Sequence, residues 1–296
     1  MASKTAGREI KDPFIIVDPR TGARYYGGDQ AWFERGSQNF AGCGVVASAN
    51  ALRALLCKYP GAYKQAEGKL KLLGNVVLTR DEYTSVIKEL YSKMLVAELP
   101  VVSQIYDRRK MPYGSKLLKV IPPSFGMSAS SVVRGVLKYA RKHGVLLHDA
   151  YLPALYTDYD RGLDFIRKGL FESGAVILMT SFNKHSLTLY RGKAGETKDI
   201  AATSFMKSHF ATITDILYDD GEPVIKLSTW GRVATIPYKQ LHESWQKRRA
   251  YVSSLIYFIP ERSKARYRAD MRKSASFTPV AAIKTVAGPF SRIFGK

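Results

Sequence analysis

The period of the hydrophobic residues changes near Gly174, and this change constrains the fold more than any other feature of the sequence. Before Gly174, apolar residues recur every three or four positions, a spacing that predicts amphipathic helices. The predicted helices cover 43–58, 80–95, 128–143 and 161–172. Thr79 and Glu82 form a capping-box pair at the start of the second of these helices.

After Gly174 the chain consists of short apolar runs, several of which alternate with polar residues, a pattern that predicts antiparallel strands. The predicted strands cover 176–179, 186–190, 210–217, 224–227, 232–236 and 251–259, with a helical turn at 238–247. Helices followed by strands are typical of the α+β class. We therefore expect a helical N-terminal half packed on an antiparallel sheet formed by the C-terminal half.

The composition changes at both ends of the chain, which suggests three parts. Residues 1–29 form an N-terminal extension that contains a predicted hairpin, and residues 30–260 form the main domain. The basic tail, 261–296, holds nine Lys or Arg and two acidic residues. Residues 99–127 are rich in proline and glycine and predict an irregular segment.

The whole chain is basic, with 46 Lys and Arg against 25 Asp and Glu, a net charge of +21. Such a charge favours an anionic partner: a nucleic acid, a lipid surface, an acidic polymer or an acidic protein. No specific nucleic-acid motif is visible. The tail intersperses Phe290 and Ile293 with basic residues, which fits an arm that docks on an anionic surface; a solvated, disordered tail explains the same composition.

No apolar run approaches the ~20 residues that a transmembrane helix needs, and the basic N-terminus lacks a secretory signal. We therefore expect a cytoplasmic protein, with export by a dedicated machine as the alternative. Cys43 and Cys57 lie on one predicted helix, roughly 21 Å apart at ~1.5 Å per residue, so they should not form a disulfide. Cys57 is expected to be a small buried hydrophobic residue.

Cys43 opens its predicted helix between two glycines, in the run Gln38-Asn39-Phe40-Ala41-Gly42-Cys43-Gly44. The unpaired N–H groups and the dipole at a helix N-terminus stabilise a thiolate, the reactive form of cysteine. Cys43 is therefore the predicted nucleophile, and a buried structural thiol is the alternative. Gln38 is the predicted donor to the oxygen on which charge develops, with Asn39 as a substitute.

His209 is the predicted general base, because it begins the clearest alternating strand. The next strand ends in Ser228-Thr229-Trp230-Gly231, and antiparallel pairing brings the start of one strand close to the end of the other. His209 and Ser228 are therefore expected to lie close together.

These motifs, in this order, resemble the papain-like cysteine peptidases, including the bacterial relatives that process double-glycine leader peptides. The resemblance covers roughly residues 30–258. In papain-like enzymes an Asn-Ser-Trp-Gly turn supplies the residue that orients the histidine, and in the leader-processing relatives an Asp does; here Ser228 occupies the Asn position. The resemblance to papain-like enzymes implies that Ser228 accepts a hydrogen bond from the Nδ1–H of His209 and so fixes its tautomer. Asp215, near the far end of the histidine's strand, is a second candidate for this role. The resemblance also implies that Trp230 shields the histidine from water.

The expected function is hydrolysis of peptide or amide bonds in a protein or peptide substrate, through an acyl-enzyme on Cys43. No metal or organic cofactor is expected, because the sequence has no glycine-rich phosphate loop, no HExxH and no paired CxxC. Two alternatives remain. The first is an acyl transferase on the same scaffold, and the second is a non-catalytic basic binding protein that retains the fold.

Overall fold

The computed structural model describes residues 12–34, 36–96, 126–180, 187–190, 204–206, 208–247 and 253–261. The chain divides into two compact units, Met1–Pro260 and Glu261–Lys296, and the fold described below belongs to the first. The predicted basic tail, apart from Glu261, and almost all of the predicted irregular segment at 99–127 lie outside the described residues, as does His185.

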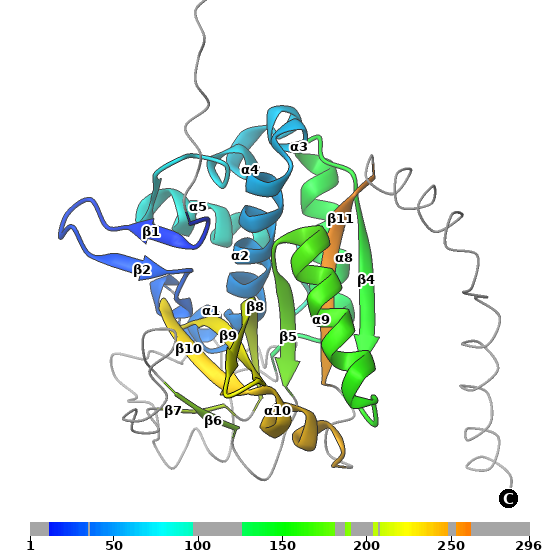
Figure 1. Cartoon of the computed structure of the whole chain (residues 1–296). Coiled ribbons are helices and arrows are strands. Elements are labelled where there is room, and N and C mark those ends of the chain that lie inside the picture. The colour runs from blue at the N-terminus through cyan, green and yellow to red at the C-terminus, as the bar shows by residue number, and fades with distance from the viewer. Residues whose placement is uncertain are drawn as a thin grey trace, which may run out of the picture. The chain divides into compact units, whose positions relative to one another are not determined.

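The centre of the first unit is a six-stranded, wholly antiparallel sheet (Figure 1). Its strands, in spatial order, are β10 (Arg232–Pro237), β9 (Glu222–Thr229), β8 (His209–Asp219), β5 (Val176–Thr180), β11 (Ser254–Pro260) and β4 (Leu147–Pro153). The fold is therefore mixed α+β, as the change of hydrophobic period predicts. The predicted strand at 186–190 forms instead a separate pair, β6 (Leu187–Leu189) with β7 (Ser204–Met206).

Helices cover both faces of this sheet, and the alternation of side chains along its strands creates two cores. On one face lie α2 (Cys43–Lys58), α5 (Arg80–Tyr91) and α8 (Ala129–Lys142), and on the other α9 (Tyr159–Ser173) and α10 (Tyr238–Trp245) (Figure 1). In β8, Phe210 belongs to the first core and its neighbours Ala211 and Ile213 to the second. Successive strand residues point to opposite faces, which explains this division.

Helix α2 lies in the middle of the first layer, against β8, β5 and β11 and against other helices (Figure 1). It is buried nearly all round, including the polar Ser48, Asn50 and Arg53, as expected for a helix enclosed by other elements. Its bounds agree with the predicted 43–58. Helix α5 begins with the predicted capping box, in which Thr79 and Glu82 bond each other's backbone N–H, but it ends at Tyr91 rather than near 95.

The predicted N-terminal hairpin is present as β1 (Ile15–Val17) and β2 (Arg24–Tyr26), to which β3 (Leu78–Thr79) adds a parallel partner. Phe14 and Ile16 are buried in the first core. After β2 the chain passes along the turn between β9 and β10, where the Tyr26 amide donates to the Gly231 carbonyl (2.9 Å) and the Gly231 amide donates to the Gly28 carbonyl (3.0 Å). The hairpin segment therefore adjoins the predicted Trp-Gly turn.

Several elements were not predicted. They are the short helices α1 (Gly36–Ala41), α3 (Pro60–Gln65) and α4 (Gly68–Leu72), the 3₁₀ turn η1 (Gln30–Trp32), and the strands β3, β4 and β7. His148 lies on β4, in a stretch for which no strand was predicted. As an edge strand β4 has one neighbour and is mostly half-buried or exposed, so its sequence lacks the apolar alternation of a two-sided strand. Within the described residues, no helix combines the length and the apolar character that crossing a bilayer requires.

Candidate active site

Cys43 is the first residue of α2 and remains partly exposed, although residues 44–56 of this helix are buried. The glycine before it is required by packing. A Cβ atom on Gly42 would lie 2.4 Å from a ring carbon of Phe33 and 2.5 Å from the Gln38 carbonyl oxygen. A Cβ atom on Gly44, the next residue of the helix, would lie 3.1 Å from a methyl carbon of Val132. Close packing thus explains Gly42, and it leaves little room for a side chain at Gly44.

His209 is the first residue of β8, where backbone and side-chain bonds anchor it. Its amide donates to the Thr180 hydroxyl and its carbonyl accepts from the same hydroxyl, both at 3.2 Å. The imidazole Nε2 lies 2.8 Å from Oγ1 of Thr229. Trp230 stacks on the ring with centroids 4.5 Å apart and planes at 24°. The histidine is therefore fixed in place and covered by the indole.

The residue that holds His209 is thus Thr229, whereas sequence analysis proposed Ser228. The Ser228 hydroxyl donates to the Tyr26 carbonyl (2.8 Å) and accepts from the Asn50 side-chain amide (3.1 Å). The strand register explains the difference. Ser228 lies opposite Thr212, and both side chains bond to groups on α2. Thr229 is one residue further along, at the end of β9, and its hydroxyl lies against His209 instead.

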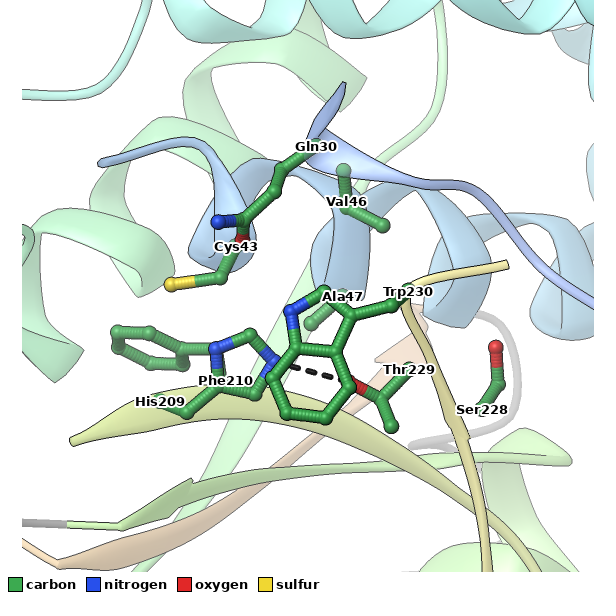
Figure 2. A pocket seen from close by; sticks show the side chains of 9 residues that line it. All are labelled: Gln30, Cys43, Val46, Ala47, His209, Phe210, Ser228, Thr229 and Trp230. Carbon is green, nitrogen blue, oxygen red and sulfur yellow. Dashed lines mark hydrogen bonds between the residues drawn. The ribbon is translucent and has the colours of Figure 1, made fainter. Parts of the chain in front are cut away.

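The bonded ring atom of His209 also differs from the prediction, because it is Nε2 rather than Nδ1. This leaves Nδ1 for the thiol, and Figure 2 shows the second ring nitrogen on the side of the Cys43 sulfur. Asp215, the other proposed orienting residue, is exposed and bonds the amide of Ile216.

Cys43 and His209 line a common pocket, which also takes in both residues that end β9 (Figure 2). Its lining consists of Gln30, Cys43, Val46, Ala47, His209, Phe210, Ser228, Thr229 and Trp230. The cavity has about 10 Å³, the space that one water molecule requires. The structure therefore brings the predicted nucleophile and base together in a narrow site.

Gln30 supplies the side-chain amide of this pocket, a role that sequence analysis assigned to Gln38. Gln30 begins η1, which Asp29 caps by accepting from the Ala31 amide, and Figure 2 shows its side chain extending toward Cys43. Within the described part of the chain, its Oε1 is buried and has no hydrogen-bond partner. Gln38 and Asn39 lie on α1 and are not among the residues that line the pocket.

No local sequence signal marks Gln30, since it lies thirteen positions before Cys43 and only the tertiary fold brings the two together.

The electrostatics of the pocket favour neutral groups. Burial raises the pKa of the Cys43 thiol, and hydrogen bonds from the backbone amides of Phe210 and Gly44 only partly oppose this effect. Burial lowers the pKa of His209 to about 3. At neutral pH the site therefore holds a thiol and an uncharged imidazole, because both charged forms lose solvation in this surrounding.

His143 and His242 have bonding partners outside the pocket. His143 contacts Glu89 at 3.1 Å, and His242 lies 2.9 Å from the Thr157 carbonyl oxygen. Cys57 is partly exposed, where a small buried hydrophobic residue was predicted, and both cysteines are free thiols. Among the described residues, no three His, Cys, Asp or Glu side chains gather in a way that could hold a metal ion.

No protein-family model matches the chain, and no curated protein matches it.

Proposed function

We propose that this protein is a papain-like cysteine hydrolase that cleaves amide bonds in a peptide or protein substrate. The observation that carries the proposal is the contact between His209 Nε2 and the Thr229 hydroxyl, within the pocket that His209 shares with Cys43. When Nε2–H donates to Thr229, the neutral ring carries its lone pair on Nδ1. That nitrogen is then the base for the thiol of Cys43.

The reaction proceeds by acyl transfer. His209 Nδ1 takes the thiol proton as sulfur attacks the substrate carbonyl, and the carbonyl oxygen gains negative charge. The Cys43 backbone amide and the Gln30 side chain stabilise this oxygen. His209 then donates the proton to the leaving amine, which leaves a thioester on Cys43, and a water molecule activated by His209 hydrolyses that thioester.

The neutral pair determines how the proton moves. A thiol with a raised pKa beside an imidazole with a lowered pKa does not form a stable thiolate–imidazolium pair in the unliganded site. Proton transfer therefore accompanies attack on the substrate. Trp230 stacks on the His209 ring and so helps to keep the imidazole uncharged. The backbone φ of Trp230 is 49°, which is unusual for a residue with a large side chain.

Acyl transfer to an amine would use the same residues as hydrolysis. The two reactions share the thioester and differ only in the group that resolves it. The residues that line the pocket include no Lys or Arg, so the positive charge of the chain does not come from the pocket lining.

An activated ester tests the proposal without knowledge of the natural substrate. p-Nitrophenyl acetate would acetylate Cys43 and release p-nitrophenolate in a burst equal to the enzyme concentration. We expect the burst to disappear in Cys43→Ala and His209→Ala, and to persist in the matched thiol control Cys57→Ala. Mass spectrometry should locate the acetyl group on Cys43, and adding a primary amine identifies a transferase by a new amide product. Equal labelling of both cysteines would contradict the proposal.

A further inference from the structure

We infer that Asn50 is a positioning residue: with Ser228 it clamps the chain at Tyr26–Gly28 and so places Gln30 in the pocket. The inference rests on the proposed function, in which Gln30 stabilises the oxyanion. It also gives Ser228 a role, although this residue does not contact His209 through its hydroxyl.

Asn50 lies on α2, two turns after Cys43, and only 2% of it is exposed. Its Oδ1 accepts from the Gly28 amide (3.1 Å) and from the Tyr83 hydroxyl (2.7 Å). Its Nδ2 donates to Ser228 Oγ (3.1 Å) and to Thr212 Oγ1 (3.4 Å). A side-chain amide has two donor hydrogens and two acceptor lone pairs. All four positions are therefore used, which fixes both the orientation and the identity of the side chain.

The chain that this amide holds has no room to move toward it. A Cβ atom on Gly27 would lie 2.0 Å from Ser228 Oγ and 2.6 Å from Asn50 Nδ2. One on Gly28 would lie 2.2 Å from the Tyr83 ring. The backbone thus lies directly against the clamp, and the Ser228 hydroxyl also bonds the Tyr26 carbonyl.

Gln30 follows Gly28 by two residues, across the turn that Asp29 caps with a 2.8 Å bond to the Ala31 amide. So short a connection transmits a displacement of Gly28 to the Gln30 amide. Positioning errors of about 1 Å can reduce rates by ~10²-fold when they affect a group that acts on the reacting atoms. The clamp therefore acts on catalysis through Gln30, while His209 is held by its own contacts with Thr180 and Thr229.

The test measures p-nitrophenyl acetate acylation and backbone hydrogen exchange in the full chain. Ser228→Ala removes two clamp bonds with little change of shape, and Asn50→Leu removes all four. The matched control is Ser244→Ala, which removes a buried hydroxyl that donates to the Leu241 carbonyl in α10. We expect Ser228→Ala to slow acylation about tenfold and to speed exchange at 26–31. Ser244→Ala should do neither.

A double-mutant cycle shows whether the effect passes through Gln30. In a Gln30→Ala background, Ser228→Ala should slow acylation no further. Additive losses, or unchanged exchange at 26–31, would overturn the inference even if Asn50→Leu fails to fold. If the wild-type protein shows no Cys43-dependent burst, the proposed function is wrong. Hydrogen exchange at 26–31 in Ser228→Ala still tests the clamp in that case. The two failures are therefore distinguishable.

Discussion

The burial of His209 makes the stability of the fold depend on pH. Its pKa is about 3 in the folded protein, compared with 6.5 for the free side chain. Between these values the unfolded chain binds a proton that the native state does not, so the free energy of unfolding falls as the pH falls below 6.5. At about pH 5 the loss spans roughly 1.5 pKa units, or about 2 kcal/mol at 1.36 kcal/mol per unit. Any native pKa below about 4 gives nearly the same loss.

Urea unfolding at about pH 7.5 and about pH 5 measures this difference. Carboxylates and the other histidines also titrate in this range, so the comparison needs a variant without the His209 proton. His209→Gln keeps an amide that can donate to Thr229 and does not titrate. The wild type should lose about 2 kcal/mol more than this variant between the two pH values.

Equal losses in the wild type and in His209→Gln would refute the reasoning. His209 would then have an ordinary pKa, and the uncharged thiol–imidazole pair would not describe the site. A larger loss of unfolding free energy in the wild type than in His209→Gln above pH 7 would also contradict the reasoning, because a histidine with a lowered pKa contributes no pH dependence there.

Two further substitutions test contacts around the site. Thr229→Val removes the hydroxyl that holds His209 Nε2 and should slow acylation of Cys43 by about 10²-fold, whereas Thr229→Ser should stay within a few-fold of wild type; equal rates for the two variants would show that another group orients the ring. Gly27→Ala and Gly22→Ala both place a side chain at positive φ (74° and 70°), but only Gly27 has neighbours within 4 Å of the added carbon. Each variant should lose about 1–2 kcal/mol of unfolding free energy through backbone strain, and Gly27→Ala should lose about 1–3 kcal/mol more through overlap with Ser228. Urea unfolding measures both losses, and similar losses in the two variants would show that Ser228 moves aside easily.

Much of the fold could be predicted because the necessary signals are local. The apolar spacing of 43–58 gave the bounds of α2, and Thr79 with Glu82 marked the start of α5. The strands of the sheet interior were predicted because both their faces are buried, so their apolar content is high. The edge strand β4 and the short helix α1 were missed, since a half-exposed strand and a six-residue helix produce little periodicity.

The sequence by itself determined that Cys43 begins a helix and that His209 begins a strand, because each position depends on residues nearby. It also determined that a Trp-Gly turn ends the following strand. Only the tertiary structure decided which neighbours serve these two residues. Strand register placed Thr229 against His209 and Ser228 against Asn50. The clamp around Gly28 brought Gln30 to the pocket from thirteen residues before the cysteine. Both outcomes depend on packing between segments far apart in the chain, which no local pattern records.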